Sequence, residues 1–181
     1  HKVPEPFVVI ATQNPKGSAG TQLLPESQLD RFMICMSMGY PDLDSEIEIA
    51  KGRSVKSDID QVSSILRSDE LEKLQEYVRL IHVHDSIYKY IAELMSATRE
   101  NAYIELGVSP RGTIACTKMA KAHAFLEGRT YVLPEDVAAV FTDVARHRIV
   151  LNTKARVSHV TEMAVLQKIL SEVKQPASYM E

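Results

Sequence analysis

The chain has 181 residues, of which 45% are hydrophobic and 25% are charged, so it can bury the core of one globular domain or somewhat more. Its 21 Lys and Arg against 24 Asp and Glu give a formal net charge of -3, which disfavours wrapping of nucleic acid or adhesion to acidic membranes. No apolar run approaches the roughly 20 residues of a membrane span. Cys35 and Cys116 lack metal or redox spacing. We therefore expect a soluble, cytoplasmic protein with two reduced thiols and no membrane span.

The first 40 residues predict a βαβ unit. Residues 7–12 (FVVIAT) are apolar and β-branched without interruption, which is typical of a strand buried on both faces of a parallel sheet. A loop rich in Gly, Pro and Asn follows, and residues 25–32 (PESQLDRF) predict a short helix that begins at Pro25. A second strand is expected over residues 33–39, because the connection between the two strands is long enough to cross over.

From Tyr40 onward the sequence favours helices, so we expect a mainly α chain. The first would run through SEIEIAKGR (45–53) after Asp42 or Asp44 as N-cap, and VKSDIDQ (55–61) is expected to be a connector. A Ser, Pro or acidic residue stands near the start of each later helical pattern, and Gly107 and Gly128 are expected to end two segments. These later helices are expected over residues 68–77, 85–101, 109–127, 134–149 and 160–173.

The boundary near Tyr40 divides the chain into a short α/β piece, residues 1–40, and a longer all-α piece, residues 41–181. Two strands and one short helix cannot cover both faces of a parallel sheet. The α/β piece therefore resembles the last part of a domain whose earlier strands are absent. An exposed strand edge at residues 7–12 could also drive dimerisation or domain swapping.

Three polar residues are candidates for contact with phosphate. Asn14 follows the first predicted strand, where ligands of open α/β sheets bind, although an Asn before Pro also initiates turns. Arg31 ends the short helix and could clamp a phosphate across an interface, or simply pair with the adjacent Asp30 at the surface. Arg111 lies in the first turn of a helix, where the dipole disfavours cations, so it is either an anion ligand or an exposed side chain.

Other polar patterns carry no comparable prediction. GSAGT (17–21) lacks the spacing of a phosphate-binding G-x-x-x-x-G-K-[ST] loop, so a mobile loop is the simpler interpretation. His82 and His84 have no carboxylate or thiol cluster at metal-ligand spacing. We expect no metal site and no complete catalytic centre within this chain.

Five motifs occur in an order and spacing that resemble the MoxR family of AAA+ ATPases, and together they cover nearly the whole chain: FVVIATQNP, LPESQLDRF, SMGYPD, GVSPRG and YVLPEDV. The resemblance implies that residues 1–40 are the C-terminal remnant of the AAA+ α/β nucleotide-binding core. It implies that residues 41–181 form the helical AAA+ lid, which moves against the core as the nucleotide changes.

The resemblance also assigns roles to the candidate residues. Asn14 would be the sensor 1 residue, which orients the attacking water and contacts the γ-phosphate. Arg31 would be the arginine finger, which reaches the ATP of the neighbouring subunit. Arg111 would be sensor 2, which binds the γ-phosphate and reports its loss to the lid, and Pro110 and Tyr40 would help to wall the adenine site.

The chain departs from the family pattern because it contains neither a Walker A loop nor a Walker B acidic strand. We expect both to lie upstream of His1, so that this chain is the C-terminal part of a longer ATPase. We expect the chain alone to be inactive and to bind nucleotide weakly at best. The longer parent is expected to use ATP and Mg²⁺.

The resemblance implies a homo-oligomeric ring that couples ATP hydrolysis to chaperone-like remodelling or activation of client proteins, some of them with von Willebrand factor A domains. Two alternatives remain open at this point: a non-enzymatic helical interaction domain, and the lid of a motor like magnesium chelatase or the minichromosome-maintenance proteins. The acidic balance of the chain argues mildly against a DNA motor.

Overall fold

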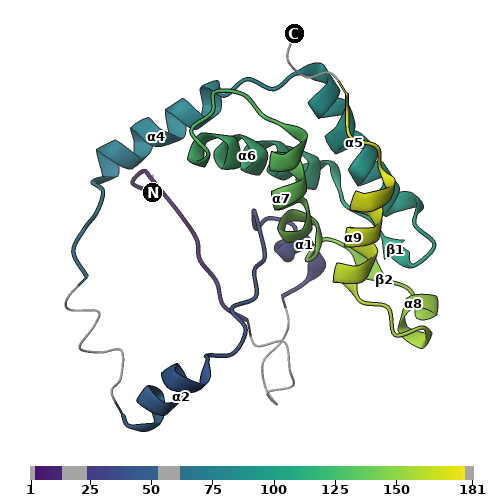
Figure 1. Cartoon of the computed structure of the whole chain (residues 1–181), viewed down its shortest axis with the longest axis horizontal. Helices are drawn as coiled ribbons and strands as arrows, with labels where there is room; N and C mark the ends of the chain where they lie inside the picture. The colour runs from purple at the N-terminus through teal and green to yellow at the C-terminus, as the bar shows by residue number, and fades with distance from the viewer. Residues whose placement is uncertain (1–2, 14–23, 53–61, 178–181) are drawn as a thin grey trace.

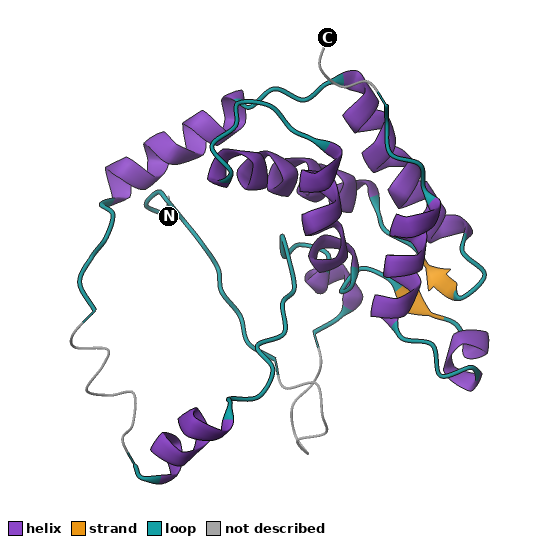
Figure 2. Ribbon diagram, viewed as in Figure 1, coloured by secondary structure: helices purple, strands orange, loops and turns teal. Residues whose placement is uncertain are grey.

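A computed structural model describes residues 3–13, 24–52 and 62–177 of the chain (Figure 1). Helices dominate these residues, and one small antiparallel sheet accompanies them (Figure 2). The mainly α prediction is confirmed. In chain order the elements are α1 (Glu26–Leu29), α2 (Leu43–Ala50), α4 (Ser68–Leu80), α5 (Asp85–Glu100), β1 (Ile104–Leu106), α6 (Pro110–Leu126), α7 (Pro134–Ala145), β2 (Val150–Leu151), α8 (Thr153–Val157) and α9 (Glu162–Glu172).

Four helices, α5, α6, α7 and α9, pack around one hydrophobic core, and we call residues 81–173 the helical body. Its large buried side chains come from α5, α7 and α9 at helical spacing, whereas α6 contributes mostly small residues that let its neighbours approach closely. The fully buried members include Ile87, Leu94, Phe141 and Leu166. Burial of this apolar surface is the main driving force for the fold.

The turn between α6 and α7 is fixed by a buried carboxylate. Gly128 takes the left-handed conformation, with φ of 72°, and ends α6 as the sequence predicts. Asp136, which is fully buried at the start of α7, accepts hydrogen bonds from the backbone N–H of Leu133 at 2.7 Å and from Arg129 Nη1 at 2.6 Å. Its other oxygen lies 2.7 Å from Nδ1 of His123. These bonds join the end of α6 to the start of α7.

The sheet was not foreseen in the sequence. β1 and β2 pair antiparallel, with Ile104 opposite Leu151, and this pairing ties the loop after α5 to the segment after α7. An isolated bridge between His82 and Tyr131 closes the other end of the body. The short helix α8, whose N-cap Asn152 accepts a bond from Ala155 N at 3.1 Å, was also missed. Both strands are too short for a periodic pattern to reveal them.

The two strands predicted before Tyr40 are not formed, so the prediction of a βαβ unit is wrong for this structure. Residues 3–13, which we call the arm, have no regular secondary structure, and Phe7 and Ile10 are 66% and 89% exposed. Residues 33–39 are likewise irregular. A parallel strand bonds only to neighbouring strands, and no other strand lies beside either segment in the part of the chain that the structure describes.

The helices predicted after Tyr40 are confirmed, with ends that shift by several residues at some boundaries. Asp42 caps α2 through its carboxylate, which accepts from Ser45 N at 2.8 Å, and α2 and α4 bury no residue of their own. Figure 1 shows the arm and α2 extending away from the helical body, whereas α4 contacts α6. The predicted connector, residues 55–61, lies outside the described residues. Among the described helices, none combines the length and the apolar character that crossing a bilayer requires.

Candidate functional site

The start of α6 places Arg111 at the surface. Ser109 is the N-cap and Pro110 is the first helical residue, as predicted, and a Pro here costs no hydrogen bond because the first N–H groups of a helix have no partner within it. The side chain of Arg111 is 55% exposed, and its Nη1 lies 3.9 Å from Oδ2 of Asp30. This separation is an ion pair without a close hydrogen bond, so Arg111 can exchange Asp30 for another anion at little cost.

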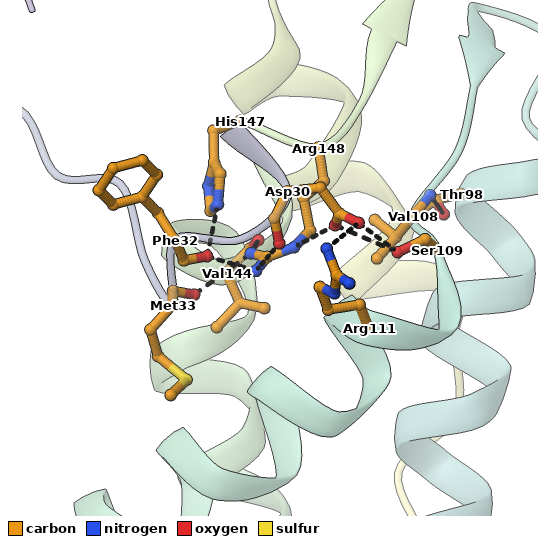
Figure 3. Close-up of polar contacts among 10 residues, drawn as sticks. All are labelled: Asp30, Phe32, Met33, Thr98, Val108, Ser109, Arg111, Val144, His147 and Arg148. Atoms are coloured by element: carbon orange, nitrogen blue, oxygen red, sulfur yellow. Dashed lines mark hydrogen bonds and ion pairs between the residues drawn. The ribbon is translucent and has the colours of Figure 1, made fainter. Parts of the chain in front are cut away.

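Asp30 is the centre of the site, although the sequence suggested it only as a possible partner for the adjacent Arg31. Ser109 occupies the N-cap position, but its hydroxyl makes no hydrogen bond to the backbone of α6. The hydroxyl donates instead to the Asp30 carboxylate, whose oxygens lie 3.0 and 3.1 Å away. The carboxylate therefore lies at the N-terminal end of α6, where the helix dipole stabilises negative charge. Asp30 follows α1 directly, so this contact joins α1 to the helical body (Figure 3).

Arg148 holds the same carboxylate from the other side. Its side chain is 1% exposed, and its Nε donates to Oδ1 of Asp30 at 3.0 Å. Nη2 donates to the backbone carbonyls of Asp30, at 3.1 Å, and of Phe32, while Nη1 donates to those of Met33, at 3.2 Å, and Val144. Figure 3 shows the guanidinium enclosed by these acceptors. Burial lowers the pKa of Arg148, but the Asp30 carboxylate opposes this shift and the group stays charged.

Two further contacts join the segment after α1 to the end of α7. His147 directs Nε2 at the carbonyl of Phe32, 3.2 Å away, and the N–H of Cys35 donates to the carbonyl of Asp143 at 2.9 Å. Burial lowers the pKa of His147, and the nearby Arg148 cation lowers it further. His147 is therefore neutral near pH 7 and donates from Nε2 to the carbonyl.

The fit of Arg148 depends on a glycine in α6. A Cβ added to Gly112 would lie 2.2 Å from Cγ1 of Val108 and 3.0 Å from Cδ of Arg148. Val108 is itself fixed, because its N–H donates at 3.0 Å to the hydroxyl of the buried Thr98 on α5. The aliphatic part of Arg148 thus lies against the first turn of α6 where only a glycine leaves room.

Arg31 differs from its neighbours in having a free side chain. Its residue is exposed, and within the described parts of the chain its guanidinium has no ion pair or hydrogen bond. Asp30 on one side and Phe32 on the other are both held by Arg148. A charged side chain is thus presented to solvent from a backbone that is fixed on both sides.

The remaining predicted site residues do not join this cluster. Asn14 lies outside the described residues. Tyr40 is 97% exposed, so it packs against no other group in the part of the chain that the structure describes. Pro110 is exposed beside Arg111. The shared role of Tyr40 and Pro110 at an adenine site stays a prediction.

The side chains that contact Asp30 are mainly cationic. Two guanidinium groups, those of Arg111 and Arg148, contact one carboxylate, Asp30, so the net charge of these three side chains is positive. No group of three or more His, Cys, Asp or Glu able to hold a metal occurs among residues 3–13, 24–52 and 62–177. The role of Arg111 toward a phosphate stays a prediction.

Asp30 and Arg148 were missed for identifiable reasons. The run ARHRI is typical of the basic end of a helix that complements the dipole, which is an ordinary surface feature. Asp30 and Arg148 are 118 residues apart, and a single sequence carries no signal for such a pairing. The apolar Ile149 beside Arg148 was the only local hint of burial.

Comparison with known proteins identifies the class of protein to which the helical body belongs. The AAA lid domain matches residues 96–169, and the ATPase family associated with various cellular activities (AAA) matches residues 1–34. The two matched segments contain Arg111, Arg148, Asp30 and Arg31. The chain therefore carries sequence of an AAA+ ATPase, including its lid.

The relatives define the family more closely. The chain is 34% identical over 183 aligned residues to Chaperone MoxR1 of Mycobacterium tuberculosis, covering 96% of this chain and 48% of that protein. It is 37% identical over 172 residues to the uncharacterized protein YeaC of Bacillus subtilis, covering 95% of this chain and 54% of YeaC. The chain belongs to the MoxR family of AAA+ ATPases, and it spans about half the length of these relatives.

A solved structure has the same fold. The crystal structure of a candidate ATPase from Cytophaga hutchinsonii superposes with a TM-score of 0.86 at 35% identity. The superposition covers 97% of this chain and 56% of the other.

Proposed function

We propose that this chain is part of a ring-forming ATPase that couples ATP binding and hydrolysis to remodelling or activation of client proteins, including proteins with von Willebrand factor A domains. One observation carries the proposal: the exposed Arg111 pairs loosely, at 3.9 Å, with the fixed carboxylate of Asp30, and the exposed Arg31 is the next residue of the chain. Membership of the MoxR family supports ATP as the anion that they meet. The two free thiols, Cys35 and Cys116, are compatible with the cytoplasm as the compartment.

The two arginines have different roles in this proposal. Arg111, beside Pro110 at the start of α6, binds the γ-phosphate and gives up its long pairing with Asp30 when it does so. Arg31 has no partner of its own among the described residues and stabilises charge on the ATP of the neighbouring subunit. Asn14, by its resemblance to sensor 1, orients the attacking water. ATP supplies the phosphoryl group, and Mg²⁺ is held by residues other than those described here.

The experiment is the Arg31→Ala variant of the full-length protein that contains this chain. Retained ATP binding with hydrolysis reduced by about 10³-fold or more is the expected result for an arginine finger. Arg79→Ala is the matched control, because Arg79 is an exposed arginine on α4 whose side chain pairs with Glu76 on the same helix. Unchanged hydrolysis in Arg31→Ala would refute the assigned role.

Arg111 and the isolated chain provide two further tests. Arg111→Ala is expected to weaken binding of ATP more than binding of ADP, since only ATP carries the γ-phosphate. The 181-residue chain on its own is expected to show no turnover, because its sequence contains no Walker A loop. A turnover by the chain alone that Arg111→Ala abolishes would contradict this part of the proposal.

A further inference from the structure

One side chain, Arg148, makes most of the polar contacts that hold the backbone around Arg31. The guanidinium of Arg148 has five N–H donors, and it uses them on five acceptors: the Asp30 carboxylate and the carbonyls of Asp30, Phe32, Met33 and Val144. Three of the four carbonyls belong to residues within two positions of Arg31. No donor of the Arg148 guanidinium remains unused.

The groups that hold residues 30–35 belong to the helical body. Arg148 and the Val144 carbonyl lie at the C-terminal end of α7, where His147 and the carbonyl of Asp143 bind the same segment. The arm, by contrast, leaves its apolar side chains exposed. The segment 30–35 is therefore attached to α7, and it must follow α7 when the helical body moves.

The Asp30 carboxylate extends this attachment to α6. It accepts from Ser109 at the N-terminus of α6 and from Arg148, and it lies 3.9 Å from Arg111. One carboxylate thus joins the turn that carries Arg111 to the segment that carries Arg31. A change of position at either arginine is transmitted through a partly buried ion pair, which is rigid because every N–H donor of the buried Arg148 guanidinium is used.

We infer that Arg148 is a positioning residue for Arg31: through the Arg148–Asp30 pair, the helical body that binds one nucleotide through Arg111 also orients the arginine offered to the next subunit. This inference rests on the proposed function. It adds a residue and a physical connection, namely that loss of Arg148 affects the contribution of Arg31 to hydrolysis more than it affects nucleotide binding at the subunit's own Arg111.

The first measurement is steady-state hydrolysis by the full-length protein carrying Arg148→Lys or Arg148→Met. Lysine has three donors for the five acceptors, and methionine has none. Both variants are therefore expected to lower kcat by about tenfold or more, while KM changes less than about threefold. Arg146→Met is the matched control, since Arg146 is two residues away and has no polar side-chain contact in the described structure. If Arg148→Met loses its helical circular dichroism, Arg148→Lys carries the test. A wild-type kcat in Arg148→Lys overturns the inference.

Mixed rings separate this inference from the proposed function. Subunits with Arg31→Ala and subunits with Arg111→Ala are first co-assembled; each supplies what the other lacks, so recovered hydrolysis is the reference result. Arg148→Lys subunits are then expected to recover hydrolysis with Arg111→Ala subunits and to recover none with Arg31→Ala subunits. If the reference pair fails to recover, the proposed roles of both arginines fall, and the inference with them. If only the Arg148→Lys mixture with Arg111→Ala fails, the inference alone is overturned.

Hydrogen exchange gives a readout that does not depend on catalysis. Arg148→Lys is expected to speed exchange at the amides of Arg31, Phe32 and Cys35 by about tenfold or more, while α5 and α9 keep their protection. Unchanged exchange at these three amides would show that Arg148 does not hold the segment.

Discussion

Apolar side chains are exposed in the arm and buried in the helical body. In the arm, residues 7–10 are Phe, Val, Val and Ile, and all four are more than half exposed. In the body, side chains of the same kinds, such as Ile87 and Phe141, are fully buried. A helix satisfies its own backbone and needs only a partner face, whereas a strand also needs neighbouring strands to satisfy its N–H and C=O groups. Apolar composition alone therefore does not decide which segment is buried.

The largest expected effect sharpens this comparison with a matched pair of phenylalanines. Phe141→Ala removes a fully buried ring from α7 and is expected to lower the free energy of unfolding of the chain by about 3–5 kcal/mol. Phe7→Ala removes a ring that is already exposed and is expected to change it by less than about 0.5 kcal/mol. Urea unfolding followed by helical circular dichroism measures both. Similar losses in the two variants would show that the arm packs against the body in solution.

The next effect concerns the polar part of the body. Asp136→Asn leaves Arg129 and His123 without the carboxylate that they share and is expected to lower the free energy of unfolding by about 2–3 kcal/mol. Asp69→Asn, on the exposed α4, is the control and is expected to cost less than about 0.5 kcal/mol. Equal effects of the two substitutions would contradict the importance of the buried network.

The same network predicts a pH dependence. Burial raises the pKa of Asp136, but the hydrogen bonds from Arg129, Leu133 and His123 outweigh it, so the net pKa is below the ordinary value. The folded state therefore binds this proton less readily than the unfolded chain, whose carboxyl titrates at about 3.9. The stabilisation by Asp136 is complete above that pH and is lost as the pH falls through the folded pKa. Asp136→Asn should flatten the acid limb of stability against pH.

The smallest expected effect compares two glycines. Gly112→Ala places a methyl group against Val108 and Arg148 and is expected to cost about 1–3 kcal/mol of unfolding free energy. Gly39, in the irregular segment before α2, has a φ of 67°, but a Cβ added there would meet no atom within 4 Å. Gly39→Ala is therefore expected to cost about 1 kcal/mol or less. Thermal unfolding of the two variants checks the order. The reverse order would show that the space between Gly112, Val108 and Arg148 accommodates a larger residue at position 112.

The helices could be predicted from the sequence because their signals are local. Ser109, Pro110, Gly128 and Pro134 mark starts and ends that the structure reproduces within a few residues. The predicted strands failed for a physical reason: residues 7–12 have the composition of a central strand, but strand formation depends on partners that a local pattern does not contain.

The site was predicted in part. Arg31 and Arg111 were selected; in the structure Arg111 lies 3.9 Å from Asp30, and Arg31 is exposed. Arg148 was not selected, because its burial and its five acceptors arise only after α7 packs against a segment more than a hundred residues earlier in the chain. Their roles toward a nucleotide stay predictions until the variants are measured.

The two cysteines can report separately on local and global unfolding of the chain. Cys116 lies in the core of the helical body, where burial raises the pKa of its thiol to about 12, so alkylating reagents reach a reactive thiolate only after the body unfolds. Cys35 is only half buried, and its N–H donates to the carbonyl of Asp143, near the end of α7. Labelling of Cys35 therefore reports release of the segment that carries Arg31, and labelling of Cys116 reports global unfolding. One alkylation time course can thus time two separate events without any engineered probe.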